Sequence, residues 1–508
     1  MRIQYYTAPC GAGKSFQAAQ RMINCSGRYL VVRDRVAAIG EYAGLLSNMA
    51  ANAGVSIPIA VITNKRGASV RLQVEDIPND YGCLDHVIVL ITHKAMMMSD
   101  FTGFDGWSII IDETPVVLDR QDLQTSQSSA FFERNYDLEP IHKSWASVTL
   151  SREGWETTPA DLERDDCFRL LRTFHERVTA ATALPEDCNQ SMVRRSHKHE
   201  PSRRAVVGNL MDWSDMEDGR RWTWWSLWSP HQLDAFSSVE FMANGFDQSL
   251  TFQMLRNLNP DIQWVEVPMT SSRTFAERTV RIEFFAKKHE ASQSLFDTDE
   301  GKANLNAIAK YLRNRDQVWM CNDRHASDLI GTGGIKLSPL QAGSNQYAGY
   351  HAATMLYCAK PNAEARSVMN LLGVDADVWT HSNEYEPILQ FACRTSVRDP
   401  NSSETVTLTV YDSEQADYLA TYFAAQPHCV VDLAYVDLGI TDEVRKRGPV
   451  AMDLSVEEAE AKIVEDKAKR AAAAVARRAK ERAERDAKGE TRKPGRPKAD
   501  RPQPSQPS

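Results

Sequence analysis

The sequence has no long hydrophobic segment, and no apolar run approaches the ~18–20 residues that a membrane-spanning helix needs. The nine cysteines are scattered and none stands in a Cys-x-x-Cys pair, so the sequence offers no zinc framework and its thiols are expected to be reduced. A phosphate-loop pattern begins at Ala8, which leaves no room for a signal peptide before it. These absences predict a cytoplasmic protein without membrane contact.

Length and composition indicate a globular chain of about three domains, since 42% of its 508 residues are apolar and 25% are charged. The net charge of −9 is distributed unevenly. From Lys467 to the end the chain carries 14 basic and 5 acidic residues, which leaves the first 466 residues at −18. An acidic body with a basic tail predicts that the tail meets a polyanion, and nucleic acid is the expected partner.

The first motif is a glycine-rich turn between a candidate strand, Met1–Thr7, and a helix-prone segment, Phe16–Ile23. The backbone N–H groups of such a turn bind phosphate oxygens, and the positive end of the following helix adds to this. Lys14 is expected to reach the β- and γ-phosphates of ATP, and the Ser15 hydroxyl to ligate Mg²⁺. The residues expected to bind the nucleotide are Ala8, Pro9, Cys10, Gly11, Ala12, Gly13, Lys14 and Ser15. The alternative is an ordinary glycine-rich turn.

One position of this loop departs from the usual G-x-x-x-x-G-K-[ST] pattern. Ala8 stands where the pattern has its first glycine. A methyl group is tolerable there if the residue does not need a positive φ.

A second motif follows about 95 residues later, at Trp107–Pro115. Three isoleucines followed by two acids predict a buried parallel strand that ends in Asp112 and Glu113. Ligands of open α/β sheets lie at the carboxyl ends of the strands. Asp112 is therefore expected to hold Mg²⁺ through water, and Glu113 to orient or deprotonate the attacking water. The alternative, a strand that happens to end in surface acids, is less favoured beside a phosphate loop.

Two more strand-like runs, Arg28–Arg33 and His86–Ile91, lie between these motifs. Strands that alternate with helices at this spacing build a parallel sheet with helices on both faces. The polar residues at the strand ends, Arg33, Thr92 and His93, should share the rim with the nucleotide. They are predicted to contact a nucleic-acid backbone, with solvated strand-end residues as the equally favoured alternative.

This ordered set of motifs resembles the superfamily 2 helicases, DEAD/DEAH-like P-loop ATPases, of phage or mobile-element type. Motif I corresponds to Ala8–Ser15, and motif II to Asp112–Pro115, which reads Asp-Glu-Thr-Pro. Weaker matches follow in the family's order at Val31–Asp34 (Ia), Thr92–Ala95, Val239–Phe246 (III), Gln317–Asn322 (IV), Pro339–Tyr347 (V) and Gln390–Arg398 (VI). The resemblance implies an α/β fold with two RecA-like domains, parallel sheets and ATP hydrolysis in the cleft between them.

The resemblance also assigns catalytic roles in the segment that corresponds to motif VI. Such helicases place a Gln or His first, and their later arginines reach across the cleft to the γ-phosphate. This implies roles for Gln390, Arg394 and Arg398. Arg394 follows Gln390 by four residues, as in the family, whereas Arg398 follows by eight, one more than usual. The choice of arginine finger between the two stays open, and surface arginines on a helix are the alternative.

The predicted domain organisation has four parts. RecA-like domain 1 comprises residues 1–120 and 236–275, with an accessory insert at 121–235. RecA-like domain 2 comprises 276–450, and 451–508 form a charged helix followed by a basic, partly disordered tail.

Two segments outside the predicted RecA-like domains have patterns that fit contacts with nucleic acid. In the insert, arginines and tryptophans interleave over Arg220–Trp228, which fits either a clamp for single-stranded bases or a hairpin core. In the tail, Arg492–Lys498 resembles an AT-hook, in which Arg496 would enter a narrow minor groove. A generic basic tail is the alternative.

Together these patterns predict an ATP-dependent nucleic-acid helicase or translocase that needs Mg²⁺, prefers DNA, and works with replication or repair proteins. Two alternatives remain at this stage: a terminase-like DNA-packaging ATPase, and a nucleotide-switched DNA-binding protein with little turnover. The sequence leaves DNA versus RNA, polarity, unwinding versus translocation and oligomeric state open.

Overall fold

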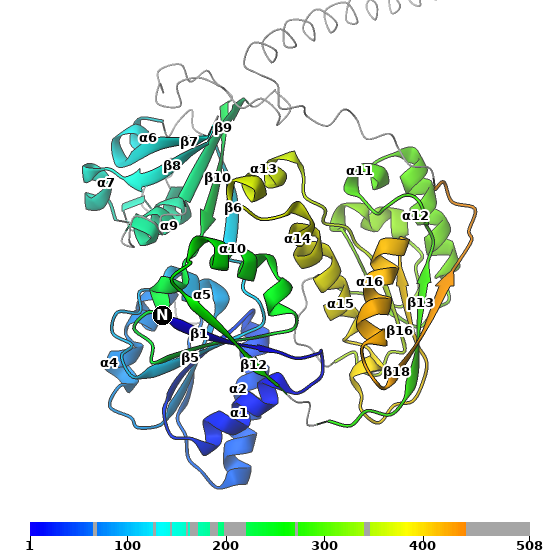
Figure 1. Cartoon of the computed structure of the whole chain (residues 1–508), viewed down its shortest axis with the longest axis horizontal. Coiled ribbons are helices and arrows are strands. Elements are labelled where there is room, and N and C mark those ends of the chain that lie inside the picture. Colours follow the sequence, from blue (N-terminus) through cyan, green and yellow to red (C-terminus); the bar gives the residue numbers. More distant parts are fainter. Residues whose placement is uncertain are drawn as a thin grey trace, which may run out of the picture. The chain divides into compact units, whose positions relative to one another are not determined.

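The computed structural model describes residues 1–64, 69–124, 129–142, 145–158, 161–162, 171–182, 191–197, 220–269, 273–339 and 346–442 (Figure 1). Residues Met1–Glu443 form one compact unit. The predicted tail with Arg496 and most of the segment that resembles motif V lie outside the described residues. None of the helices in the described part of the chain is long and apolar enough to cross a membrane.

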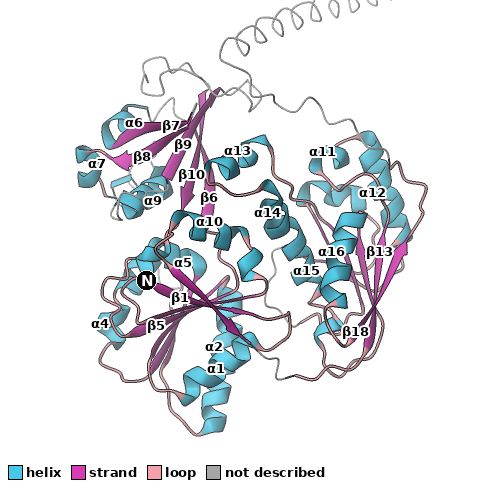
Figure 2. Cartoon of the chain, in the orientation of Figure 1, coloured by secondary structure: helices cyan, strands magenta, loops and turns pink. Residues whose placement is uncertain are grey.

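The first sheet has seven parallel strands in the order β12-β1-β11-β5-β2-β4-β3. Figure 2 draws strands in magenta and labels β1 and β5 of this sheet. Its strands are β1 (Arg2–Thr7), β2 (Arg28–Arg33), β3 (Ile59–Val61), β4 (Val87–Thr92), β5 (Trp107–Asp112), β11 (Ser238–Ala243) and β12 (Gln263–Pro268). The four strands that the sequence predicted before residue 120 are present, each within one residue of its predicted bounds. β1 lies beside β11 and β12, so the chain returns to the first sheet after the insert.

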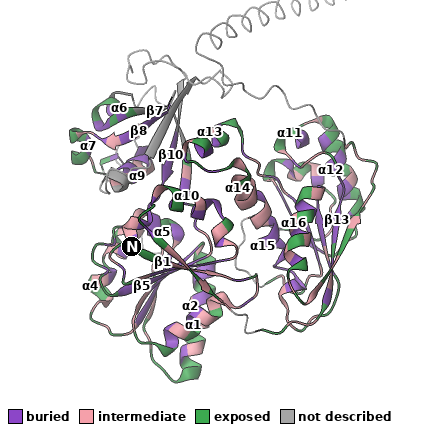
Figure 3. Ribbon diagram, in the orientation of Figure 1, coloured by how far each residue is buried: buried purple, intermediate pink, exposed green. Residues whose placement is uncertain are grey.

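Both faces of the first sheet are apolar. Successive side chains of a strand point to opposite faces, so a continuous apolar run covers both faces with apolar side chains. Leu30 and Val32 pack into the core on one face, and Val31 into the core on the other. Figure 3 colours buried stretches of the chain purple, including parts of this sheet. On the Val31 face lie α1 (Lys14–Asn24) and α2 (Val36–Ala53). On the opposite face lie α3 (Val70–Glu75), α4 (Ile77–Tyr81), α5 (His93–Met98) and α10 (Leu250–Leu258). This doubly covered parallel sheet explains why its strands are continuous apolar runs.

The insert folds as a five-stranded antiparallel sheet in the order β6-β10-β9-β8-β7. Its elements are β6 (Leu118–Gln124), α6 (Ser129–Asn135), β7 (Tyr136–His142), β8 (Trp145–Leu150), α7 (Arg152–Glu156), α9 (Arg172–Thr182), β9 (Ser191–His197) and β10 (Arg220–Leu227). Trp224, Trp225 and Trp228 are all buried, and the Trp224 ring meets Phe174 edge-on at 4.9 Å. The core interpretation of these three tryptophans is therefore confirmed, and they are not available to stack on bases.

The second parallel sheet has six strands in the order β15-β14-β16-β17-β13-β18. They are β13 (Arg278–Phe284), β14 (Val318–Cys321), β15 (Ile335–Lys336), β16 (Ala352–Leu356), β17 (Val406–Val410) and β18 (Cys429–Tyr435). One face is covered by α11 (Gln293–Phe296) and α12 (Asp299–Tyr311), the other by α15 (Glu386–Ala392) and α16 (Ser413–Ala424). The predicted fold class, two RecA-like α/β domains with an accessory insert, is confirmed.

A helical stretch of the predicted second domain packs on the first. In α13 (Ala363–Leu371), Val368 and Met369 are buried in the core that covers the first sheet. Beyond it, the Asn257 Nδ2 donates to the Gly373 carbonyl at 2.9 Å. α14 (Ala376–Thr380) then leads back to α15. These contacts tie the two RecA-like domains together away from the phosphate loop.

A buried carboxyl group in this linking region makes stability depend on pH. Glu384 has no exposed surface, and its two oxygens accept hydrogen bonds at 2.8 Å from the Ala359 N–H and the Gln415 Nε2. Burial raises its pKa from 4.5 to about 7. The pKa of Glu384 is higher in the folded than in the unfolded chain. Its contribution to the free energy of unfolding is therefore full below about pH 4.5 and is lost as pH rises to about 7.

We therefore expect the free energy of unfolding to fall by up to about 3 kcal/mol across that window through this one group. Urea unfolding at a series of pH values measures it. The variant Glu384→Gln should show a flatter dependence than the wild type, and the exposed Glu277→Gln should not. Parallel curves for wild type and Glu384→Gln would contradict the assignment.

Candidate nucleotide-binding and hydrolysis site

The loop between β1 and α1 has the conformation that phosphate binding requires. Gly11 and Gly13 have φ values of 82° and 90°, and Gly13 caps the N-terminus of α1. Among the described residues Glu113 is the only non-glycine residue with a positive φ, so Ala8 does not need glycine's freedom. The Lys14 Nζ donates to the carbonyls of Ala8 and Pro9, which places the ammonium group over the loop.

Ser15 and Asp112, the two predicted Mg²⁺ ligands, lie together. The Ser15 hydroxyl donates to the Asp112 Oδ2 at 2.8 Å. Mg²⁺ is usually held by one or two protein oxygens, with substrate phosphates and water as its other ligands. The described residues contain no group of three or more His, Cys, Asp or Glu side chains that could hold a metal by themselves. A hydroxyl and a carboxylate beside a phosphate loop fit a magnesium ion bound together with a nucleotide.

Arg33 and His93 point into this site and not toward an outer surface. β2 pairs with β5, so the end of β2 lies beside Asp112, and the Arg33 Nη1 is 2.7 Å from the Asp112 Oδ2. The Arg33 guanidinium also lies 4.6 Å from the ring centre of Tyr42. The His93 Nε2 is hydrogen-bonded to the Asp112 carbonyl at 3.0 Å, and burial lowers its pKa.

The third residue predicted to touch nucleic acid, Thr92, caps α5, because its hydroxyl accepts a hydrogen bond from the Ala95 N–H at 3.1 Å. All three side chains lie on the rim that the sequence indicated. Those of Arg33 and His93 are buried against Asp112, so the structure does not present them to a nucleic-acid backbone. Arg33 instead supplies the positive charge that holds the Asp112 carboxylate in place.

Glu113 sits where the chain leaves β5 in a left-handed turn. Its φ is 69°, and its N–H donates to the Met242 carbonyl at 3.0 Å. Burial raises the pKa of its carboxyl to about 7, and the neighbouring negative charge of Asp112 adds to the shift. A carboxyl group with a pKa near neutral suits a general base.

The segment after α15 brings two arginines to the first domain. Arg394 is 2% exposed, and its Nε and Nη1 are buried without a hydrogen-bond partner. Burial lowers its pKa to about 10, with repulsion from Arg35 next in size, while the charge of Glu113 acts in the opposite direction. Arg394 therefore lies within electrostatic range of Arg35 and Glu113 of the first domain.

Arg398 approaches the phosphate loop itself. Its Cγ would lie 3.9 Å from a Cβ built on Gly11. Unlike Arg394, it is partly exposed. The structure thus brings both predicted arginines to the first domain's site and distinguishes them by burial and position.

Arg278, a residue without a motif, holds the arginine segment in place. It is buried at the start of β13 and donates to the carbonyls of Ser396 and Asp399. The Ser396 hydroxyl is hydrogen-bonded to the His351 Nδ1 at 2.7 Å. These bonds fix the turn that carries Arg394 and Arg398.

Gln390, the first residue of the segment that resembles motif VI, is hydrogen-bonded to Glu386. Its Nε2 donates to the Glu386 Oε1 at 3.3 Å. The Asn244 Nδ2, from the motif III segment after β11, donates to the same oxygen at 3.2 Å. The pKa of Glu386 is raised to about 7, mainly by burial. Glu386, which no sequence pattern singled out, thus links the two segments across the domains.

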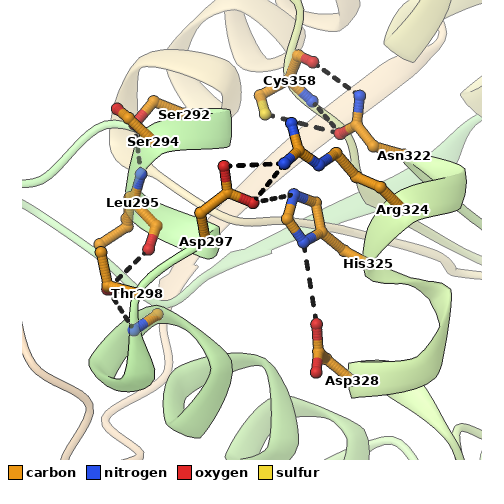
Figure 4. Close-up of polar contacts among 11 residues, drawn as sticks. Ser292, Ser294, Leu295, Asp297, Thr298, Asn322, Arg324, His325, Asp328 and Cys358 are labelled. Atoms are coloured by element: carbon orange, nitrogen blue, oxygen red, sulfur yellow. Dashed lines mark hydrogen bonds and ion pairs between the residues drawn. The ribbon is translucent and has the colours of Figure 1, made fainter. Parts of the chain in front are cut away.

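The rim of the second sheet is held by a separate polar cluster (Figure 4). Asn322, after β14, donates to the Cys358 carbonyl at 2.8 Å and accepts from its N–H at 3.0 Å, which ties the ends of β14 and β16 together. Arg324 pairs with Asp297 at 2.8 Å. Burial lowers the pKa of the neighbouring His325. This cluster orders the end of the strand predicted as motif IV.

Comparisons with known proteins locate no family. No protein-family model matches the sequence, and no curated protein is significantly similar to it. Among solved structures, the chain aligns with XPD in its apo form at 10% identity and a TM-score of 0.48, over 85% of this chain and 97% of that one.

Two further structures align over a similar share. S. tokodaii Xpd4 does so at 12% identity and a TM-score of 0.44, over 85% of this chain and 96% of that one. S. cerevisiae Dbp5 bound to RNA and ADP BeF3 does so at 8% identity and a TM-score of 0.35, over 85% of both chains. Alignments at this level of identity and score say nothing about the chemistry of this chain.

Proposed function

We propose that the protein is an ATP-dependent nucleic-acid helicase or translocase that hydrolyses Mg-ATP between its two RecA-like domains and acts on DNA. The observation that carries the proposal is Arg394. A buried arginine with two donors lacking partners is costly unless something anionic meets it. It is within electrostatic range of Glu113, and Arg398 of the same segment approaches Gly11 of the phosphate loop, so the γ-phosphate of a bound nucleotide would fit the unpaired donors.

Each residue of the site has its own role in phosphoryl transfer. Bound Mg-ATP supplies the phosphates and a cation that neutralises their charge. The loop N–H groups and Lys14 hold the phosphates, and Ser15 and Asp112 hold the ion. Glu113 orients the attacking water and accepts its proton, and Arg394 stabilises the charge that develops as the bond breaks.

The bonds at Glu386 offer a route from hydrolysis to motion. Asn244 follows a strand of the first domain, and Gln390 belongs to a helix of the second. Both donate to one carboxylate. When a bound nucleotide draws the domains together, the hydrogen bonds to Glu386 couple the movement of the two segments. This coupling links ATP hydrolysis to stepping along a nucleic-acid strand.

The nucleic-acid partner is inferred from charge. The basic C-terminal segment contrasts with a body that carries −18 up to residue 466, and a body of that sign would not attract a polyanion by itself. The DNA preference rests on the AT-hook-like Arg492–Lys498. Replication or repair proteins are the proposed further partners.

The proposal is tested by steady-state ATPase assays on the full chain with and without single-stranded DNA, duplex DNA and RNA. We expect Mg²⁺-dependent hydrolysis that DNA stimulates at least tenfold, less so at high salt, and that Lys14→Ala abolishes. Strand displacement on 3′- and 5′-tailed duplexes then separates unwinding from translocation. ATP hydrolysis that no nucleic acid stimulates would overturn the motor, and nucleotide-dependent DNA binding without turnover would favour a switch.

A further inference from the structure

Two cysteines from opposite domains meet beside the hydrolysis site. Cys10 lies in the phosphate loop, and Cys393 immediately precedes Arg394. Both line one small cavity with Tyr422 and Arg398. Cys10 packs against the core cluster of the second sheet that contains Cys393, and the Cys10 N–H donates to the Tyr422 hydroxyl at 2.8 Å. Neither cysteine is needed for phosphate binding by its side chain, since the loop acts through its backbone.

The environment makes Cys10 the reactive member of the pair. Its pKa is lowered to about 6, first by its interaction with the neighbouring Cys393 and further by the charges of Lys14 and Arg398. The Cys10 residue is partly exposed, whereas Cys393 is buried. A thiolate is the form that peroxides oxidise, and a neighbouring thiol resolves the product.

We propose that Cys10 and Cys393 form a reversible disulfide that joins the phosphate loop to the Arg394 segment and stops ATP turnover. The consequence for turnover rests on the proposed function, whereas formation of the bond does not. No pairing of this kind was foreseen from the sequence, where the two residues are far apart and lack a Cys-x-x-Cys spacing.

The chemistry uses a peroxide as oxidant. The Cys10 thiolate attacks the peroxide oxygen, the O–O bond breaks, and a sulfenic acid forms while the other oxygen leaves as water after protonation. The Cys393 thiol then attacks the sulfenic sulfur, which releases a second water and forms the S–S bond. Two thiols and one hydrogen peroxide thus give one disulfide and two waters. A dithiol reductant reverses the reaction by exchange.

The disulfide should inhibit because it fixes a distance that the reaction has to change. ATP binding and hydrolysis alternately close and open the cleft between RecA-like domains in the proposed mechanism. A covalent bond of about 2 Å between the loop and the arginine segment holds one separation only. It also removes the thiolate whose charge now faces Lys14 and Arg398.

The test treats the full chain with hydrogen peroxide, blocks free thiols, and analyses non-reduced tryptic peptides. Cys10 lies in the peptide 3–14 and Cys393 in the peptide 367–394. We expect these two peptides linked, a fall in ATPase rate of at least 50-fold, and recovery of both after dithiothreitol. Cys393→Ser, with Cys393→Ala as a second variant should the first fail to fold, should show neither change.

The exposed Cys25→Ser is the matched control and should respond like the wild type. Absence of the linked peptide would overturn the inference whatever the ATPase shows, and so would equal inhibition of the Cys393 variants. A quantitatively linked protein that retains its ATPase rate would overturn the inhibitory role. By contrast, a reduced protein with no ATPase activity, linked or not, would refute the proposed function instead.

Discussion

Replacing Arg394 with alanine is expected to lower the ATPase rate about 10³-fold or more, the contribution that an arginine aimed at the transferred phosphate makes to such reactions. The reason is geometric. The guanidinium is buried within electrostatic range of Glu113 with two donors unpaired, so the charge is in place before the transition state forms. Single-turnover hydrolysis of ATP by the variant measures the loss without interference from product release.

Two matched variants decide which arginine is the finger. Arg398→Ala should cost much less in the chemical step, because Arg398 lies at Gly11 and is partly exposed. Its loss should mainly weaken nucleotide binding. Arg394→Lys keeps a charge but not the planar fork, and should recover only part of the rate. A larger loss for Arg398→Ala than for Arg394→Ala would reverse the assignment.

The variant Arg394→Ala should leave the nucleotide-free protein at least as stable as the wild type. Arg394 is desolvated and repelled by Arg35, which together lower its pKa to about 10. Removing such a group takes away an unfavourable interaction, whereas the stabilisation by bound nucleotide should shrink. Thermal unfolding with and without Mg-ATP distinguishes this from simple misfolding.

The sequence was most informative where local pattern and chemistry coincide. The glycines of the phosphate loop need positive φ, and Ile109–Ile111 before two acids define a buried strand end, so Ser15 and Asp112 could be predicted to meet. Spacing could not show which way a strand-end side chain turns. Arg33 and His93 were placed on the correct rim, but their contacts with Asp112 depend on which strand lies next to β5.

Contacts between distant segments could not be predicted from the sequence for a different reason. Glu386 meets Asn244 from 142 residues away, and Cys10 lines the same small cavity as Cys393 of the other domain. Each partner is an ordinary residue in its own segment, so no local pattern marks it. The packing of α13 on the first domain was missed likewise, because an amphipathic helix shows that it has a buried face but not which surface covers it.

Replacing Glu113 should strongly slow hydrolysis, and different substitutions separate the role of its carboxyl group from that of its backbone conformation. Glu113→Gln keeps the shape but cannot accept a proton, and we expect a rate loss of about 10²–10⁴-fold, with nucleotide binding retained. Rapid-quench measurement of ATP cleavage, beside an equilibrium binding assay, checks both. Loss of binding in parallel with the rate would assign Glu113 to holding the nucleotide and not to the water.

The backbone at Glu113 supplies the second property, since its φ of 69° is strained for any residue with a Cβ. Holding such a conformation costs on the order of 1 kcal/mol, and it persists because the turn directs the carboxyl group beside Asp112. Glu113→Ala removes the carboxyl group but keeps the strain, whereas Glu113→Gly removes both. Both variants should be inactive, yet the glycine variant should be the more stable to urea by about 1 kcal/mol. Equal stabilities would mean that the turn is not strained and that function alone selects the residue.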